Sequence, residues 1–187
     1  GRHQESLDEA DKALALNNTI LRCHFRRCKS LYYLKRYDPS LRAALAFVRG
    51  TDLHASRNAF NYFQESVIKA FVCSRAIAKP YAYELASEAI VALLDMKPEY
   101  TYAGWWLRLG FVQLRAGPAD RAVRSLERAV DLLPLNPPNY AIRKGKLLET
   151  SRPLLEVVRR KGVKATGAYR KVINQLERVR GSKAKLP

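Results

Sequence analysis

Cysteine is scarce in this chain: its 187 residues include three, Cys23, Cys28 and Cys73. Three cysteines cannot all pair within one chain. The pattern fits a reducing compartment, and we expect an intracellular protein of the cytosol or of an organelle matrix. Cys23 and Cys28 are five residues apart, on different faces of a helix, whereas zinc sites usually offer two cysteines separated by two residues. Cys73 falls in an apolar run, which predicts a buried free thiol.

Catalytic motifs are also missing. His3, His24 and His54 are scattered along the chain, and there is no glycine-rich loop that could cradle a phosphate. No nucleophile elbow is present. Single carboxylates such as Glu65 and Glu84 are expected to be solvated or ion-paired. The sequence therefore predicts a protein that is not an enzyme and that needs neither a cofactor nor a metal ion.

Long apolar runs are absent as well, since none approaches the ~20 residues that cross a bilayer. We therefore do not expect a membrane partner. Nine glycines and nine prolines stand mostly between segments of helical periodicity. These segments predict helices at residues 3–16, 21–35, 39–49, 53–79, 81–96, 101–116 and 119–133. Asp38 is expected to cap the third helix, with Pro39 at its first position, and Pro80 is expected to end the fourth.

One segment carries small, aromatic and turn-forming residues at a fixed spacing: Trp106, Leu109, Gly110, Gly117, Ala122, Leu126, Ala129 and Pro134. Small side chains at Gly110, Ala122 and Ala129 would let two helices approach closely. Pro134 ends the second helix because proline cannot donate the next backbone hydrogen bond. This pattern resembles the tetratricopeptide repeat, a helix-turn-helix unit of about 34 residues that works by stacking.

The same register recurs upstream. The position of Ala122 recurs at Ser6, Ser40 and Ala86, with steps of 34, 46 and 36 residues. Two further series keep these irregular steps: Ala13, Phe47, Leu93 and Ala129, and Asn18, Asp52, Pro98 and Pro134. One insertion of twelve residues explains all three series.

The resemblance covers residues 1–134. It divides them into an incomplete first repeat at 1–18 and repeats at about 19–52, 53–98 and 99–134, of which the repeat at 53–98 has a lengthened first helix. The fold that the resemblance implies is all-α. It is an α-solenoid of antiparallel helix pairs wound into a right-handed superhelix.

Beyond residue 134 the register fails, because Glu156 and Arg160 occupy positions that should be small and packed. We expect residues 135–187 to form capping helices near 138–150, 153–161 and 165–180, with a basic tail. Residues 141–187 hold fourteen Lys and Arg against three Asp and Glu, a net charge of +11 out of +17 for the chain. The basic surface is predicted at Arg159, Arg160, Lys161, Lys164, Arg170, Lys171, Arg178 and Arg180. Such a surface either attracts an anionic partner or simply keeps the protein in solution.

In the family that the pattern resembles, the first helix of each repeat lines a concave groove that holds a peptide. The ligand-contacting positions of the family include Arg22, Phe25, Arg26, Lys29, Tyr32, Tyr33, Arg108 and Phe111 here. The insertion blurs the register of the middle helix, and Arg57 and Asn61 lie near its equivalent start. The helix at 21–35 would thus combine cations and aromatic rings on one face. The aromatic members have an alternative interpretation, which is that they pack between neighbouring repeats.

Two hypotheses for the function follow. The first is a non-enzymatic adaptor or scaffold subunit that binds an acidic or amphipathic segment of another protein in its groove and docks by its basic end. The second is a structural subunit of a ribonucleoprotein, with an organelle as one candidate setting, whose C-terminal helices contact RNA phosphates.

Overall fold

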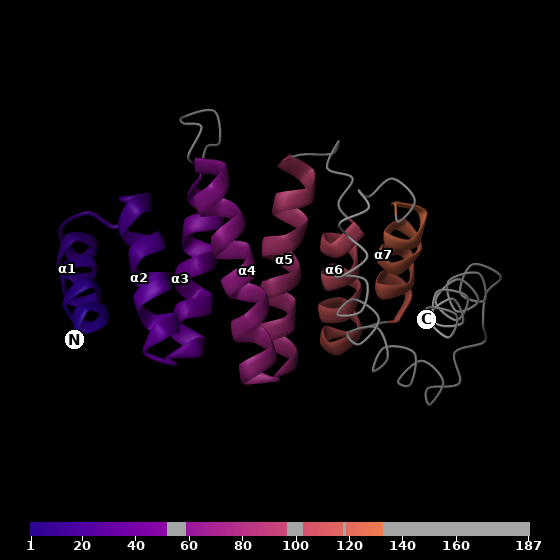
Figure 1. The fold of residues 1–187 in the computed structure, drawn as a ribbon, viewed down its shortest axis with the longest axis horizontal. Coiled ribbons are helices and arrows are strands. Elements are labelled where there is room, and N and C mark those ends of the chain that lie inside the picture. Colours follow the sequence, from indigo (N-terminus) through magenta and orange to yellow (C-terminus); the bar gives the residue numbers. More distant parts are fainter. Residues whose placement is uncertain (52–58, 97–102, 118, 133–187) are drawn as a thin grey trace, which may run out of the picture. The chain divides into compact units, whose positions relative to one another are not determined.

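The computed structural model describes residues 1–51, 59–96, 103–117 and 119–132, and these residues form seven α-helices and no β-strand (Figure 1). The described part of the chain is therefore all-α, as predicted. Its helices are α1 (Arg2–Leu16), α2 (Leu21–Tyr33), α3 (Tyr37–Gly50), α4 (Ala59–Ile77), α5 (Pro80–Met96), α6 (Ala103–Ala116) and α7 (Ala119–Leu132). The predicted capping helices lie outside the described residues. Among the described helices, none is both long and apolar enough to span a bilayer.

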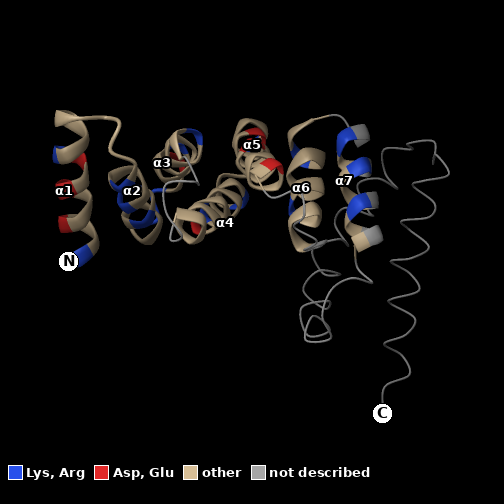
Figure 2. Ribbon diagram, turned by 90° about the horizontal axis from the view of Figure 1, so that it is seen from above, with Lys and Arg blue, Asp and Glu red and all other residues tan. Residues whose placement is uncertain are grey.

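Two compact units make up the chain: Gly1–Lys97, which contains α1 to α5, and Pro98–Pro187, which contains α6 and α7. In the first unit each helix packs on the next one along the chain, α2 also contacts α4, and α3 contacts α5. Consequently α2 and α4 lie on one side of this unit and α3 and α5 on the other (Figure 2). We call these the α2–α4 side and the α3–α5 side.

Three of the four small-residue positions of the repeated register are buried. Ser40, Ala86 and Ala122 have almost no exposed surface. Ser6 is half-buried, because it lies on α1, which packs mainly on α2. Large apolar side chains, with Phe63 fully buried among them, fill the space between the helices. The register that was found in the sequence therefore marks true packing positions.

The two hairpins of the first unit turn in the same way. Lys35 and Ala78 both have a left-handed backbone, with φ of 59° and 55°. Each stands two residues before a helix, since α3 begins at Tyr37 and α5 begins at Pro80. A left-handed residue at this place breaks the helical path and allows the chain to reverse. A residue other than glycine is destabilised by about 1–2 kcal/mol in this conformation. The left-handed residue nevertheless occurs in both turns, because the chain must reverse there.

The boundaries of α3 correct one prediction. This helix begins at Tyr37 and its N-cap position is Arg36, which makes no side-chain capping bond. Asp38 therefore lies in the first turn and does not cap the helix. Its carboxylate instead accepts hydrogen bonds from the Tyr81 hydroxyl at 2.7 Å and from Arg42 Nε at 3.0 Å.

The boundaries of α4 correct another prediction. We expected one helix over residues 53–79, but α4 ends at Ile77, before the left-handed Ala78. Pro80 does not end this helix and is instead the first residue of α5, where its missing N–H costs nothing. Residues 53–58 lie outside the described part. With 19 residues, α4 is still the longest of the described helices.

The second unit confirms the close approach that its small residues predicted. A Cβ added at Gly110 would lie 2.8 Å from two side-chain carbons of Leu126 and 3.3 Å from the carbonyl oxygen of Ala122. These are closer than normal van der Waals contacts, so α6 and α7 can pack this tightly because residue 110 has no side chain. The Ser125 hydroxyl also donates a hydrogen bond to Gln113 Oε1 at 2.7 Å, which joins the two helices.

Candidate functional site

The strongest imbalance of charge in the described residues lies on α2. This helix has four cations and no carboxylate. Arg22, Arg26 and Lys29 follow one another at one-turn spacing and form a cationic stripe on one face of the helix. Arg22 and Arg26 are exposed, and neither forms an ion pair with a residue that the structure describes. Arg27 is not part of this stripe. Its Nε lies 2.6 Å from Oδ1 of Asp11 on α1, with which it forms an ion pair.

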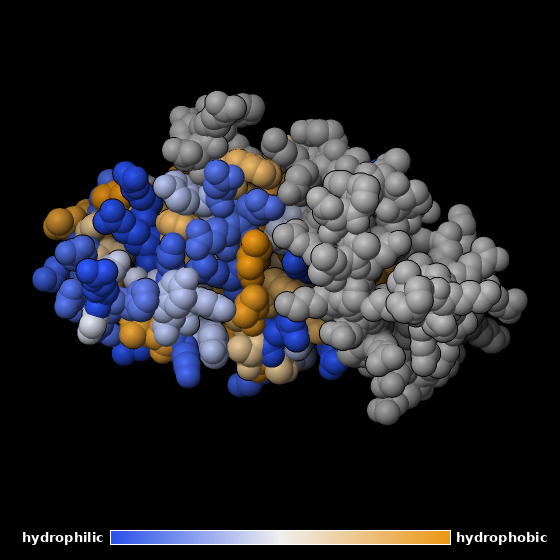
Figure 3. Space-filling view, in the orientation of Figure 1, coloured by the Kyte–Doolittle hydropathy of each residue, from blue (hydrophilic) through white to orange (hydrophobic). Residues whose placement is uncertain are grey.

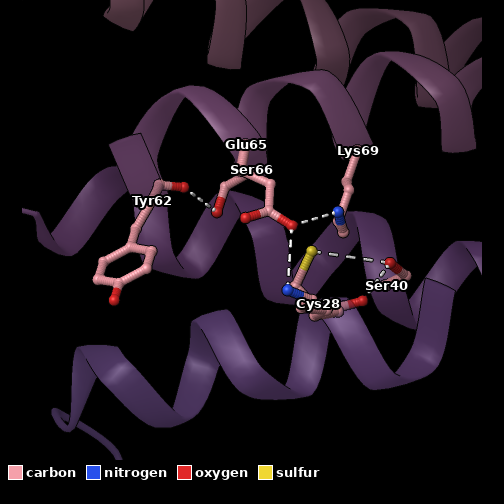
Figure 4. A network of polar contacts seen from close by, with 7 residues as sticks. Cys28, Ser40, Tyr62, Glu65, Ser66 and Lys69 are labelled. Atoms are coloured by element: carbon pink, nitrogen blue, oxygen red, sulfur yellow. Dashed lines mark hydrogen bonds and ion pairs between the residues drawn. The ribbon is translucent and has the colours of Figure 1, made fainter. Parts of the chain in front are cut away.

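The third member of the stripe joins α2 to α4. The carboxylate of Glu65 on α4 accepts a hydrogen bond from Lys69 Nζ at 2.7 Å and lies 3.5 Å from Lys29 Nζ (Figure 4). Burial by itself raises the pKa of Glu65, but the hydrogen bond and charge of Lys69, together with Lys29, lower it below its ordinary value of 4.5. Glu65 is therefore ionised at neutral pH and balances two lysines.

Lys69 is unusual because it is a buried cation, with 7% of its surface exposed. Its ammonium group lies 5.2 Å from the ring centroid of Tyr32 and 5.8 Å from that of Tyr33. Rings at this distance attract a cation, and the ion pair with Glu65 offsets more of the cost of leaving water. Tyr32 and Tyr33 thus hold the lysine in place at the α2–α4 side.

Aromatic rings flank this network. The ring of Phe25 packs 5.6 Å from that of Phe47 and 4.7 Å from that of Tyr62. His3 stacks on Tyr33 at 4.6 Å with an interplanar angle of 14°. Tyr33 and Tyr62 remain exposed, Tyr33 with 50% of its surface accessible. They therefore offer aromatic surface to a partner, whereas Phe25 is buried.

An apolar strip completes the surface. Over α2 and α4 the face drawn in Figure 3 is largely hydrophilic, with one band of hydrophobic residues over α4. Ile68 and Val72 are one turn apart on α4, the first exposed and the second half-buried. The described residues of the α2–α4 side thus combine unpaired arginines, tyrosine rings and aliphatic side chains.

Two thiols lie beneath this surface. Cys28 and Cys73 are free and fully buried, which confirms the prediction for Cys73. Burial raises the pKa of the Cys28 thiol from 9.0 to about 12 and also raises that of Cys73. Ser40 Oγ donates a hydrogen bond to the carbonyl oxygen of Cys28 at 2.8 Å and lies 3.8 Å from its sulfur. Because the reactive form of cysteine is the thiolate, these thiols are structural at neutral pH.

Comparison with models of protein families, with curated proteins and with solved structures returns no match. The function is therefore inferred from the contacts within the chain itself. Within the described ranges, no three side chains of His, Cys, Asp or Glu gather where they could hold a metal ion.

The predicted groove residues of the first unit have different surroundings. Arg22, Arg26, Tyr33 and Asn61 are exposed, as ligand contacts require. Lys29 and Tyr32 are half-buried and belong to the Glu65–Lys69 network. Phe25 packs against other rings, so its assignment to the groove is corrected in favour of the packing interpretation. Arg57 lies outside the described residues.

The groove residues of the second unit pack within that unit. The guanidinium carbon of Arg108 lies 4.8 Å from the ring centroid of Trp105, and its Nη1 donates to the carbonyl oxygen of Gly104 at 3.4 Å. Phe111 is buried, with the guanidinium carbon of Arg115 at 5.7 Å from its ring centroid. The packing interpretation therefore applies to Phe111 as well. The predicted basic surface between residues 159 and 180 lies outside the described part.

The predicted site residues did not include Tyr62, Glu65 or Lys69. Glu65 and Lys69 are four residues apart, the spacing of a helical ion pair, and this signal was available in the sequence. The contact of Glu65 with Lys29 joins residues of two helices, and no local pattern in the sequence predicts it. Glu65 is ion-paired, which is one of the two states expected of it.

Proposed function

We propose that this chain is a non-enzymatic interaction subunit that binds an acidic, amphipathic segment of another protein on its α2–α4 side. The observation that supports this most directly is the pair of exposed arginines, Arg22 and Arg26, which have no ionic partner among the described residues. Two like charges one turn apart repel each other slightly, so they do not help the helix to form. A function in binding accounts for their presence.

The surface indicates the chemistry of the partner. Carboxylates of the partner would pair with Arg22 and Arg26, whose planar guanidinium groups bind carboxylates through two parallel hydrogen bonds. Apolar side chains of the partner would lie against Tyr62 and Ile68. A helical or extended segment with acidic and apolar residues on adjacent stripes satisfies both parts.

We propose in addition that the described helices belong to a tetratricopeptide-like solenoid. Three observations support this finer fold: the helices pack as consecutive pairs, the two hairpins of the first unit each have a left-handed residue in the turn, and three of the four predicted small positions are buried. In such a fold α2 and α4 would be first helices and would line the concave face.

The binding proposal can be tested by reversing the two charges. The dissociation constant of a fluorescent acidic peptide is measured for the unaltered chain and for Arg22→Glu/Arg26→Glu. We expect affinity to fall by about tenfold or more, since each reversed contact replaces attraction by repulsion.

A matched control is available on the α3–α5 side. Arg42→Glu/Arg49→Glu makes the same change in net charge, but these arginines are already paired with Asp38 and Glu88. Affinity should change by less than about threefold in this variant. Equal effects of the two double variants would exclude the α2–α4 side as the binding surface.

A second candidate function is favoured by the net charge of +11 on residues 141–187. In this hypothesis the C-terminal region contacts RNA phosphates in a ribonucleoprotein. Affinity for single-stranded RNA would then fall steeply with salt, with a slope of roughly 0.7 per contacted phosphate on a double logarithmic plot. Removal of residues 159–187 should abolish binding, and a truncated chain that binds RNA as tightly as the full chain would exclude this site.

A further inference from the structure

Two lysines on the α2–α4 side, Lys29 and Lys69, are already bound to a carboxylate of the protein itself. Arg22 and Arg26 are free of ionic partners among the described residues, whereas Lys29 and Lys69 share the side chain of Glu65. In Figure 4 a dashed line joins this carboxylate to the nitrogen of Lys69, and Lys29 Nζ lies 3.5 Å from the same carboxylate. It thus occupies the position that a carboxylate of an acidic partner would take.

We propose that Glu65 is an internal competitor for the carboxylates of the partner: it holds Lys29 and Lys69 in the unbound protein and limits how tightly an acidic segment binds. The inference rests on the proposed function of the α2–α4 side. It adds a residue that determines affinity and selectivity, and it predicts that removal of this residue strengthens binding.

The exposure of the three side chains allows such an exchange. Side-chain exposure is 44% for Lys29, 34% for Glu65 and 9% for Lys69. An incoming carboxylate can therefore reach Lys29 and the outer edge of Glu65. Lys69 stays in place, because the rings of Tyr32 and Tyr33 hold its ammonium group independently of Glu65.

Electrostatics gives the direction of the effect. A carboxylate that approaches Lys29 is attracted by one ammonium group and repelled by the charge of Glu65 on the same site. Removal of the Glu65 charge eliminates the repulsion and frees the lysine. Exposed and partly exposed ion pairs are modest, so we expect a gain in affinity of about three- to tenfold.

The test uses Glu65→Gln in the full chain. Glutamine keeps an oxygen that can accept the hydrogen bond from Lys69, but it carries no charge. The probe is a fluorescent synthetic peptide in which leucine and glutamate repeat at helical spacing, and its dissociation constant is measured at low and at physiological salt. The same peptide with lysine in place of glutamate should bind neither form of the chain.

The matched control is Glu88→Gln. It removes the same charge from the same unit, but Glu88 lies on α5, where it pairs with Arg49 of α3. We expect this variant to bind the acidic peptide within about twofold of the unaltered chain. If both variants bind more tightly by the same factor, the gain comes from net charge and Glu65 is no competitor.

A second pair of variants keeps the test decisive if Glu65→Gln alters stability, which thermal unfolding would reveal. Lys29→Gln should weaken binding only slightly in the unaltered chain, where Glu65 occupies the lysine. In the Glu65→Gln background the same change should remove most of the gain. Additive effects of the two substitutions would overturn the competition.

The outcomes separate this inference from the proposed function. If Arg22→Gln/Arg26→Gln weakens binding but Glu65→Gln leaves it unchanged or weaker, the binding surface stands and the role of Glu65 is wrong. If the arginine variant binds normally, the proposed function itself fails.

Discussion

The two sides of the first unit use their charged residues differently. On the α3–α5 side, Arg49 forms two hydrogen bonds with Glu88, at 2.7 and 2.9 Å, and Arg42 pairs with Asp38 at 3.0 Å. On the α2–α4 side, Arg22 and Arg26 are equally exposed but have no ionic partner among the described residues. Arg42 and Arg49 are thus paired with carboxylates of the unit, whereas Arg22 and Arg26 have no such pair among the described residues.

The distribution of aromatic residues follows the same division. On the α3–α5 side the hydroxyl of the exposed Tyr81 donates a hydrogen bond to Asp38, so its polar end is satisfied within the unit. On the α2–α4 side Tyr33 and Tyr62 expose ring surface beside the cationic stripe. Exposed aromatic rings and arginines are the residue types that contribute most to protein interfaces. The two sides therefore share a core but differ in the charged and aromatic groups that they expose.

The shared core gives the largest expected effect. Phe63 on α4 and Leu41 on α3 are both fully buried, one from each side of the unit. Phe63→Ala should lower the free energy of unfolding by about 3–5 kcal/mol and Leu41→Ala by about 2–5 kcal/mol. Chemical denaturation with far-ultraviolet circular dichroism measures this. A single transition in both variants is expected, and loss of one side alone would contradict the common core.

A smaller effect is expected at the hydrogen bond that joins the two sides. Ser40 on α3 is fully buried and donates to the carbonyl oxygen of Cys28 on α2. Ser40→Ala should destabilise the unit by about 1 kcal/mol. Ser66→Ala serves as the control, because the buried hydroxyl of Ser66 bonds to Tyr62 of its own helix. If both variants lose the same free energy of unfolding, the hydrogen bond between α2 and α3 stabilises the unit no more than the one within α4.

The exposed arginines should differ in stability as well as in binding. Arg49→Ala removes a bidentate ion pair and should cost a few tenths of a kcal/mol, as is usual at the surface. Arg22→Ala and Arg26→Ala remove no ion pair with a described residue, so each should lower the free energy of unfolding by less than Arg49→Ala does. Thermal denaturation of the three variants compares them directly. A clear loss at Arg22 or Arg26 would mean that these residues support the fold.

The smallest expected effect is on the stability of the first unit at acid pH. Asp38 has a lowered pKa, first because Tyr81 and then because Arg42 donate hydrogen bonds to it, and the pKa of Glu65 is also lowered. A carboxyl group whose pKa is lower in the folded state adds stability above its ordinary pKa, and this contribution disappears as pH falls through the folded value. The ordinary values here are 3.8 and 4.5.

The α2–α4 side should therefore lose stability below about pH 4.5 and the α3–α5 side below about pH 3.8. The first loss should be absent in Glu65→Gln and the second in Asp38→Asn. Denaturation at a series of acid pH values measures it. An unchanged acid profile in Glu65→Gln would show that the lysines around Glu65 do not stabilise its charge.

Much of the fold could be predicted from local patterns. The helices follow from periodic apolar residues between glycine and proline breaks. Burial of Ser40, Ala86 and Ala122 follows from the repeated spacing of small residues. The ends of helices were less predictable. The turns at Lys35 and Ala78 require a left-handed backbone at residues with no special preference for it, so tertiary packing sets their geometry.

The candidate site was predicted only in part, because its members come from two helices. The cationic stripe on α2 is visible in the sequence as several basic residues with no acidic residue between them. Whether a basic residue is ion-paired depends on which side chain of the neighbouring helix lies opposite it. Glu65 of α4 lies opposite Lys29 of α2 in this way. The same holds for the aromatic rings: Phe25 is buried by Phe47 and Tyr62, which lie far from it in the sequence.

The central claim is that the α2–α4 side binds an acidic segment, and amide chemical-shift mapping of the full chain tests it most directly. On titration with the acidic leucine–glutamate peptide, we expect the shifts to concentrate on α2 and α4, around Arg22, Arg26 and Tyr62. The amides around Arg42 and Glu88 on the α3–α5 side should change little. Shifts centred on α3 and α5, or no shifts in the first unit at saturating peptide, would contradict the account.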